Sequence, residues 1–549
     1  MKNLSGSSRQ ATRQLWLERV DAALRTHGYE SAARLAVEAV AEGVEHPALL
    51  NLAGLARYDE NRFEEAVRLL KKAQALAPRD PNILNSLGMS LVALGQTEGA
   101  RQAYDAALRS DPDLAAVRFN RGVLLETLND LNGARADYQR AADLNPKYVE
   151  PRASLAWLDA RAGKVASAVE HGERALALSS GNVLARMALA SVRLQQKDFA
   201  AADASLSALC EDPALSPINR SIVLSLIGDL RDAEGKAAEA FAAYEASNNG
   251  LRAIYSGQFE APGTETALGH TRRLADWFET AVPEPWRQSV PARPRAADPK
   301  AHIFLVGFPR SGTTLLENIL AAHPEVVSLE EKDCLAAASA NYMVSEDGLE
   351  RLARISSGEA LRHREAYWSL VRKFGVEPRG RVFIDKMPLS SVQLPLISKI
   401  FPDARVLFAR RDPRDVVLSC FRRRFGMNPS MYQLLTLEGA AAYYDAVMHL
   451  SEIYRSLLPL PQHVVRYESL VDDFEKTASE ACDFLGLELT TDLMDFASRA
   501  RDRGISTPSA AQVARGLNRE GQGAWRRYHQ QMAPVLPLLD PWVEKFGYA

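Results

Sequence analysis

The residues with the clearest chemistry lie between Ile303 and Leu320, where the sequence reads IFLVGFPRSGTTLLENIL. An apolar run precedes Gly307, four residues separate it from Gly312, and two threonines follow. A strand, a glycine-bearing turn and a helix in this order present backbone N–H groups and the positive end of the helix dipole to an anion. The stretch is therefore predicted to bind a phosphate-like group.

The lysine that follows the second glycine in nucleoside-triphosphate loops is absent, because Thr313 stands in its place. In those loops the lysine contacts the outer phosphates and the next Ser or Thr binds magnesium. Here Thr314 keeps the hydroxyl, and the cation within the loop is Arg310. The pattern argues against ATP or GTP hydrolysis, and the missing Gly-x-Gly-x-x-Gly argues against a dinucleotide fold.

A second candidate phosphate site lies in the run RVLFARRDPRDVVLSCFRRRF, which begins at Arg405. The run predicts a buried strand, then Arg411, then a helix that carries Ser419. An arginine fork and a hydroxyl two helical turns further on suit a phosphate monoester, a group that ATP lacks.

Together these two motifs resemble those of sulfotransferases, which use 3′-phosphoadenosine 5′-phosphosulfate (PAPS) and release 3′-phosphoadenosine 5′-phosphate (PAP). The 5′-phosphosulfate loop of that family is matched by Pro309, Arg310, Ser311, Gly312, Thr313 and Thr314, and its 3′-phosphate motif by Arg411 and Ser419. The flanking HPEV at 323–326 and the pair Glu330-Glu331 most resemble the tyrosylprotein sulfotransferase branch.

The resemblance implies a role for each of several further residues. Glu331 would be the general base, in keeping with the need of an attacking hydroxyl to lose its proton. Lys386 and Arg310 would stabilise charge on the transferring group. His323 competes as a base, because the small-molecule branch uses histidine, but its place before Pro324 favours a structural role. Ser509 would lie near the sulfuryl group, and the cofactor would be contacted by Arg423, Tyr467, Arg515, Arg519, Trp525 and Arg526.

The C-terminal residue whose positive charge would bind the 3′-phosphate is not assigned. Ala524 stands where the family has a lysine, so Arg515, Arg519 or Arg526 would supply it. No metal is expected, because fixed cations can do what magnesium does in kinases. Asp385 is the one carboxylate left open as a magnesium ligand.

These residues must be positioned by an α/β domain, and a different architecture precedes it. Gly54, Gly88 and Gly122 are 34 residues apart, and the same period relates Ala66, Ala100 and Ala134, then Ala73, Ala107 and Ala141, then Pro78, Pro112 and Pro146. Paired stretches of helical periodicity with this period resemble the tetratricopeptide repeat.

The expected fold is thus an α superhelix of tetratricopeptide repeats followed by an α/β domain with a parallel sheet and a phosphosulfate loop like a P-loop. About seven repeats are predicted over residues 1–255. A helix and a proline-rich linker without regular structure follow over 256–299, and the sulfotransferase domain occupies 300–549. The repeats favour either a scaffold or homodimer surface or a groove for a peptide.

Composition narrows the function classes. The 549 residues include 66 basic and 69 acidic ones, so neither nucleic-acid nor membrane binding is indicated by net charge. The N-terminus has no apolar core of signal-peptide length, and no run of eighteen apolar residues occurs, which favours a cytoplasmic protein. The four cysteines have neither metal-site nor disulfide spacing.

The sequence therefore predicts transfer of a sulfuryl group from PAPS to an acceptor hydroxyl, and a tyrosine of a protein or peptide held by the repeats is the first choice. Asp333 stands where the tyrosylprotein branch has an arginine that seats acidic peptides, so a glycan or small phenol stays open. A nucleotide kinase with this P-loop-like motif stays open too, as does a repeat scaffold with an inactive transferase domain.

Overall fold

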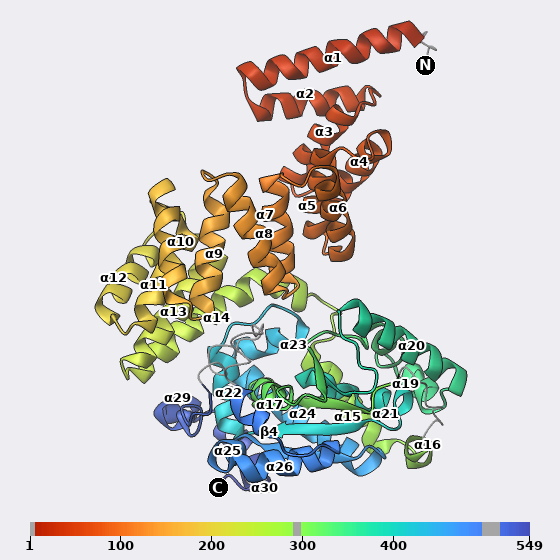
Figure 1. Ribbon diagram of the computed structural model, residues 1–549, viewed down its shortest axis with the longest axis vertical. Coiled ribbons are helices and arrows are strands. Elements are labelled where there is room, and N and C mark those ends of the chain that lie inside the picture. Colours follow the sequence, from red (N-terminus) through yellow and green to blue (C-terminus); the bar gives the residue numbers. More distant parts are fainter. Residues whose placement is uncertain (1–5, 289–297, 497–515) are drawn as a thin grey trace. The chain divides into compact units, whose positions relative to one another are not determined.

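The computed structural model describes residues 6–288, 298–496 and 516–549 (Figure 1). The chain divides into two compact units, Met1–Val192 and Arg193–Ala549. The predicted domain limits at residues 255 and 299 both lie inside the second unit. They stay predictions.

From residue 6 to residue 259 the regular structure consists of helices joined by short turns. They are α1 (Gly6–Thr26), α2 (Tyr29–Ala41), α3 (Pro47–Asp59), α4 (Phe63–Leu76), α5 (Pro81–Ala93), α6 (Thr97–Ser110), α7 (Ala115–Thr127), α8 (Leu131–Leu144), α9 (Val149–Arg161), α10 (Val165–Leu178), α11 (Val183–Gln195), α12 (Phe199–Cys210), α13 (Pro217–Ala233) and α14 (Ala237–Phe259). Taken two at a time along the chain, these described helices give helix pairs like those predicted, and the number of tetratricopeptide repeats stays a prediction.

The 34-residue period of glycine arises from close packing within each pair. A Cβ atom on Gly54 would lie 2.7 Å from Leu70, and one on Gly122 would lie 2.6 Å from the Tyr138 ring. Each of these partners comes from the second helix of the same pair, 16 residues along the chain. Only glycine lets the two helices of a pair approach this closely. The 34-residue period of glycine therefore results from a steric requirement at each pair.

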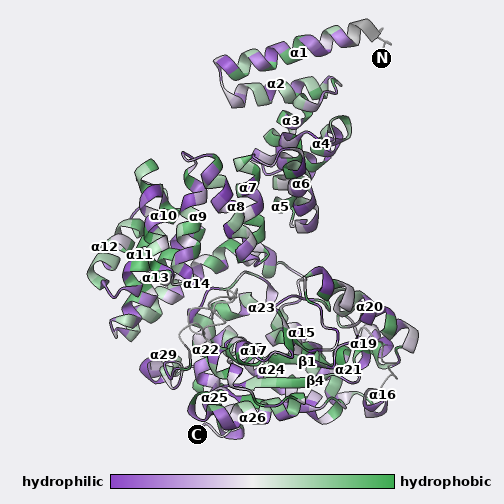
Figure 2. Ribbon diagram, in the orientation of Figure 1, coloured by the Kyte–Doolittle hydropathy of each residue, from purple (hydrophilic) through white to green (hydrophobic). Residues whose placement is uncertain are grey.

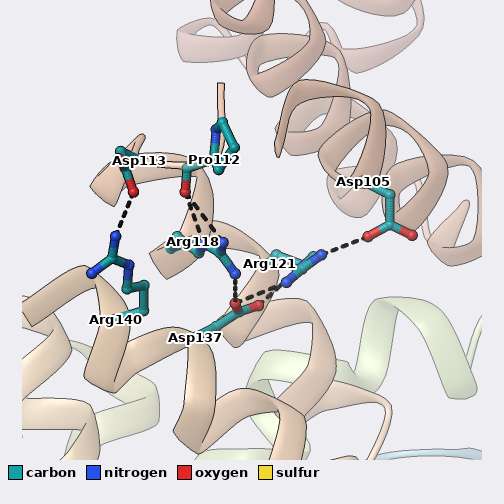
Figure 3. Close-up of polar contacts among 7 residues, drawn as sticks. All are labelled: Asp105, Pro112, Asp113, Arg118, Arg121, Asp137 and Arg140. Atoms are coloured by element: carbon teal, nitrogen blue, oxygen red, sulfur yellow. Dashed lines mark hydrogen bonds and ion pairs between the residues drawn. The ribbon is translucent and has the colours of Figure 1, made fainter. Parts of the chain in front are cut away.

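Charged side chains add specific contacts between successive pairs of the first unit (Figure 3). Arg121 on α7 donates to Asp105 on α6 (2.8 Å) and to Asp137 on α8 (2.7 Å). Asp137 is buried and also accepts from Arg118 at 3.1 Å. A buried carboxylate needs such partners, because an unpaired charge in the interior is costly.

The second unit continues with an α/β arrangement. Its helices are α15 (Ala267–Thr280), α16 (Pro283–Arg287), α17 (Thr313–Leu320), α18 (Ala336–Tyr342), α19 (Glu346–Ala353), α20 (Ser357–Lys373), α21 (Leu394–Ile400), α22 (Pro413–Arg422), α23 (Pro429–Tyr432), α24 (Leu437–Leu457), α25 (Tyr467–Asp472), α26 (Phe474–Leu485), α29 (His529–Met532) and α30 (Leu536–Lys545). Short 3₁₀ turns are η1 (Pro388–Gln393), η2 (Gln433–Leu435), η3 (Thr491–Asp495) and η4 (Ala524–Tyr528).

The amphipathic helix predicted before the proline-rich segment is present as α15. The expectation of no regular structure in that segment was wrong at its start, where α16 forms. Pro283 occupies the first turn of α16, where a missing N–H costs no hydrogen bond. Trp286 anchors this turn, because its ring is buried and packs edge-on against Phe278 of α15.

A five-stranded parallel sheet forms the centre of the second unit, with strand order β2-β3-β1-β4-β5. The strands are β1 (Ala301–Gly307), β2 (Val326–Glu330), β3 (Val382–Lys386), β4 (Arg405–Arg410) and β5 (Gln462–Arg466). This confirms the predicted parallel sheet. In open parallel sheets ligands bind beyond the carboxyl ends of the strands, which is where β1, β3 and β4 deliver the predicted site residues.

Two apolar layers cover the sheet, as expected for strands buried on both faces. One layer is formed by α17, α25 and α26, with Leu316, Ile319 and Cys482 against the sheet. The other includes α21, α22 and α24, with Ile397 and Val417. Figure 2 shows β1 and β4 in hydrophobic colours between helices of mixed character. A rigid, buried sheet therefore holds the strand ends in fixed positions.

Candidate active site

The loop after β1 leads directly into α17, which is the strand-turn-helix order that the sequence predicts, and its binding of a phosphate-like group stays a prediction. Its backbone is left-handed at Arg310 (φ 70°) and at Gly312 (φ 96°). A Cβ atom on Gly312 would lie 3.0 Å from the ring of Tyr467, so glycine is required by both conformation and space. Thr313 and Thr314 follow, buried in the first turn of α17. The strained arginine marks the loop as a functional candidate, since such outliers gather at ligand sites.

The two predicted phosphate motifs meet in the structure although about a hundred residues separate them. Arg310 Nε donates to Ser419 Oγ at 3.0 Å. Arg411 Nη1 donates to the carbonyl oxygen of Arg310, also at 3.0 Å. Cys420, next to Ser419, donates its thiol to the carbonyl oxygen of Pro309 at 3.3 Å. The loop after β1 and the helix after β4 therefore form one site.

Positive charge is concentrated at this meeting point. Burial is the main cause that lowers the pKa of Arg310 to about 9, and the guanidinium groups of Arg423 and Arg411 add to it. Ser311 Oγ and Arg411 Nε are buried and have no hydrogen-bond partner among the described residues. An anion with more than one negative charge would offset the repulsion and satisfy these donors.

Lys386 lies at the end of β3 and is completely buried. Its Nζ is 2.7 Å from Glu331 Oε1. The same Nζ is 3.6 Å from Glu330 Oε1 and 3.6 Å from Glu317 Oε2. Burial by itself would lower the pKa of Lys386, but these carboxylates outweigh it and raise the pKa. Lys386 is therefore held as an ammonium ion at neutral pH.

Glu331 is positioned by the ends of two strands. It follows β2, and its backbone N–H donates to the carbonyl oxygen of Lys386 at 2.9 Å. Its backbone is left-handed (φ 45°), which turns the side chain out of the strand's alternation. The side chain is 31% exposed, whereas that of Lys386 is fully buried. The pair thus joins an accessible carboxylate to a buried cation.

Sequence reasoning missed Glu317, the third carboxylate beside Lys386. Glu317 is buried on α17, and its Oε1 accepts a hydrogen bond from Ser328 Oγ at 2.8 Å. The available signal was a single charge on a helix whose apolar residues, Leu315, Leu316, Ile319 and Leu320, read as core. A charge in such a position needs a partner, and here the partner is Lys386.

A cavity of about 470 Å³ opens beside the second motif. Its lining includes Arg411, Ser419, Arg422, Arg423 and Arg527 together with Asp232. Four guanidinium groups line this cavity together with three carboxylates, of Asp232, Asp415 and Glu520, and the excess of positive charge favours a phosphorylated ligand.

Residues 302–492 match the sulfotransferase family, and residues 17–81 and 85–149 match the tetratricopeptide repeat. The chain is thus similar to the sulfotransferase family in its C-terminal half and to tetratricopeptide repeats in its N-terminal half, each over less than half of its length.

Curated relatives are similar over 45% of the chain. Protein-tyrosine sulfotransferase 2 of Gallus gallus is 28% identical over 270 residues, which span 71% of that protein. Protein-tyrosine sulfotransferase 1 of Danio rerio is 28% identical over 262 residues, which span 72% of it. An uncharacterized protein of Aquifex aeolicus is 27% identical over 271 residues, and the match spans 34% of its length.

Among solved structures, a tetratricopeptide repeat protein from Parabacteroides merdae is similar over 44% of this chain and 93% of its own. The sequence identity is 18% and the TM-score is 0.34. In the part of the chain that the structure describes, no helix combines the length and the apolar character needed to cross a membrane.

The described C-terminal segment, residues 516–549, contacts Arg411. Arg411 Nη2 donates to the carbonyl oxygen of Gly521, and its guanidinium lies 4.9 Å from the centre of the Tyr467 ring. The backbone N–H of Trp525 donates to Asp415 on α22 at 2.9 Å. Tyr467 and Trp525 therefore lie beside the second motif, and their contact with the cofactor stays a prediction.

Of the predicted C-terminal arginines, Arg519 and Arg526 do not line the cavity. Arg519 pairs with Asp472 at 2.9 Å, and Arg526 lies over the Trp525 ring at 5.7 Å. Arg527, which sequence reasoning missed, does line the cavity. The predicted residues Ser509 and Arg515 lie outside the described residues. The family resemblance identifies this segment but does not say which of its arginines faces the cavity. The structure is needed to distinguish Arg527 from Arg526.

Asp385 faces away from the loop. Successive residues of a strand point to opposite faces, and Asp385 accepts from Tyr367 on α20 at 2.6 Å. Within the described ranges, no group of three or more His, Cys, Asp or Glu side chains is arranged to hold a metal ion. Metal-free transfer stays a prediction.

Both ring nitrogens of His323 contact backbone groups, of Glu325 and Glu488, in keeping with the structural role expected.

Replacing Asp385 by asparagine is expected to flatten the pH dependence of stability. Burial is the main cause that raises the pKa of Asp385 from 3.8 to about 7, although the bond from Tyr367 opposes it. Between these values the folded state holds a proton that the unfolded chain has lost, so stability falls as the pH rises. Across this range the thermal midpoint of the wild type should fall relative to that of Asp385→Asn. Equal slopes would contradict the assignment.

Proposed function

We propose that the sulfotransferase-family domain transfers the sulfuryl group of PAPS to an acceptor hydroxyl. The observation that carries the proposal is the pair of bonds from Arg310 to Ser419 and from Arg411 to Arg310. These bonds join a loop suited to a 5′-phosphosulfate to a motif suited to a 3′-phosphate. ATP has no 3′-phosphate, so a site built from both motifs favours PAPS as the donor.

The residues around Lys386 fit the chemistry of the transfer. As the acceptor oxygen forms its bond to sulfur, the bond from sulfur to the 5′-phosphate oxygen breaks, and PAP leaves with the added negative charge. Glu331 accepts the proton of the acceptor hydroxyl. Lys386, Arg310 and the first N–H groups of α17 stabilise the charge that develops on the equatorial and bridging oxygens. The ion pair of Glu331 with Lys386 orients the carboxylate.

We propose a tyrosine of a protein or peptide as the acceptor. Two of the similar proteins are protein-tyrosine sulfotransferases, and tetratricopeptide repeats are commonly surfaces for protein partners. The local charge refines this choice. Glu330 and Asp333 are acidic residues on either side of the proposed base, Glu331, so an acceptor with neutral or basic neighbours fits better than an acidic peptide.

Incubation with PAPS that carries ³⁵S, in a lysate of cells that contain the natural partners, tests the function. Label on tyrosine residues of a protein supports the full proposal. Label on a glycan or a small phenol keeps the transfer and replaces the acceptor. Absence of label from every fraction, with a folded enzyme that binds PAP, would contradict sulfuryl transfer.

A further inference from the structure

The last helix pair of the repeat array, α13 with α14, packs directly on the helix that carries Ser419. Asn248 of α14 donates through Nδ2 to the carbonyl oxygen of Phe421 at 2.9 Å, in a buried position. The rings of Phe241 and Phe421 stack with their centres 4.8 Å apart. These contacts lie within the second unit, Arg193–Ala549. This helix pair is therefore part of the structure that holds α22 in place.

Asp232, close to the end of α13, reaches from this pair into the cavity. Its carboxylate pairs with Arg422 Nη2 and lies 3.0 Å from Arg527 Nη1. It also accepts from the Tyr528 hydroxyl at 2.6 Å. Burial by itself would raise the pKa of Asp232, but these three partners together lower it. Asp232 is therefore a carboxylate at neutral pH, and it lines the same cavity as Arg411 and Ser419.

Asp229, one helical turn earlier, repeats the arrangement. Its Oδ2 lies 3.8 Å from Arg423 Nη1, and its Oδ1 accepts from the Tyr244 hydroxyl at 2.8 Å. Arg423 is a predicted cofactor contact and is one of the charges that lower the pKa of Arg310. Two carboxylates of the last repeat thus face the arginines of the cavity, and none of these contacts requires a ligand.

We propose that Asp232 is a counter-ion which the last repeat supplies to the donor site, where it limits the positive charge available to the 3′-phosphate. The inference rests on the proposed function, because it assumes a nucleotide with that phosphate in the cavity. Asp232 competes with the phosphate for Arg422 and Arg527, so it weakens binding of the donor and eases release of PAP. Any movement of α13 that withdraws Asp232 raises donor affinity, which links the repeats to the donor site.

Calorimetric titration of the full chain with PAP and with 5′-AMP tests this role. Asp232→Asn is expected to bind PAP about 3- to 30-fold more tightly than the wild type, because one nearby negative charge is removed. Its affinity for 5′-AMP, which lacks the 3′-phosphate, should not change. The matched control is Asp203→Asn on α12, whose carboxylate pairs with Arg231 at 2.7 Å and does not line the cavity. This control should bind PAP as the wild type does.

The opposite change, Arg527→Gln, removes a cation that Asp232 holds. It should weaken PAP binding several-fold and leave 5′-AMP binding unchanged. Because Arg527 is half exposed, this variant decides the question if Asp232→Asn fails to fold. A purely structural role of either residue would weaken the binding of PAP and of 5′-AMP alike in its variant.

Unchanged or weaker PAP binding in a folded Asp232→Asn would overturn the inference, as would unchanged PAP binding in Arg527→Gln. Equal effects on PAP and 5′-AMP would do the same, since Asp232 would then not act at the 3′-phosphate. If the wild type binds PAP and Arg411→Gln loses it while Asp232→Asn has no effect, only this inference fails. If the wild type binds no PAP, the proposed function fails with it.

Discussion

Replacing Glu331 by glutamine is expected to lower kcat by about 10²- to 10⁴-fold, the usual contribution of a positioned general base. Glutamine keeps the size of the side chain but cannot accept the proton of the acceptor hydroxyl. Lys386 still has Glu330 and Glu317 within 3.6 Å, so its charge and position are retained. PAP affinity should therefore match that of the wild type. Transfer from labelled PAPS and calorimetry with PAP measure the two quantities.

Glu330→Gln is the matched control for this variant. Glu330 precedes Glu331 directly, and its carboxylate lies near the same ammonium group. It is less exposed than Glu331, with 17% of the side chain accessible against 31%. Its substitution should cost much less activity. A loss in Glu330→Gln equal to that in Glu331→Gln, or full activity in Glu331→Gln, would remove Glu331 as the base.

Replacing Arg411 by glutamine is expected to reduce PAP affinity by about 10²-fold, since each hydrogen bond to a charged group contributes about 1.5–3 kcal/mol. Arg411 is buried and bonds to the Arg310 and Gly521 carbonyl oxygens, so the fork is held rigidly beside the cavity. Affinity for 5′-AMP should fall far less, because that ligand lacks the 3′-phosphate. Calorimetric titration with both nucleotides measures the difference.

Arg410 provides the control for Arg411, because it is adjacent in sequence and points elsewhere. Its guanidinium lies 3.8 Å from the centre of the Phe546 ring and pairs with Glu452 at 3.7 Å. Arg410→Gln is expected to lower the thermal midpoint without selective loss of PAP binding. If Arg410→Gln loses PAP and Arg411→Gln does not, the 3′-phosphate motif is assigned to the wrong arginine.

The elements of the site could be predicted from local sequence, because each is a short pattern with its own physical cause. The loop from Gly307 to Gly312 needs glycine conformations, and the repeats need glycine where helices touch. Strand and helix positions around Arg310 and Arg411 follow from hydrophobic runs and turns. The meeting of Arg310 with Ser419 was implied by the family resemblance, and the parallel sheet supplies the geometry for it.

Residues whose roles depend on distant partners were missed. Glu317 reads as one charge on an apolar helix, and its purpose is visible only when β3 brings Lys386 beside it. Asp232 lies in a repeat whose period concerns helix packing, so no local signal connects it with Arg422, 190 residues away. The density of proline from Pro283 onward predicts no regular structure, whereas the place of Pro283 in a first helical turn permits α16.

The central claim is that a phosphate loop without the usual lysine serves a donor with a 3′-phosphate. Calorimetric titration of the wild-type protein with PAP and with ATP in the presence of Mg²⁺ tests it most directly. We predict that PAP binds without added metal and that ATP with Mg²⁺ binds far more weakly. Tighter binding of ATP with Mg²⁺ than of PAP would contradict the claim and favour a kinase.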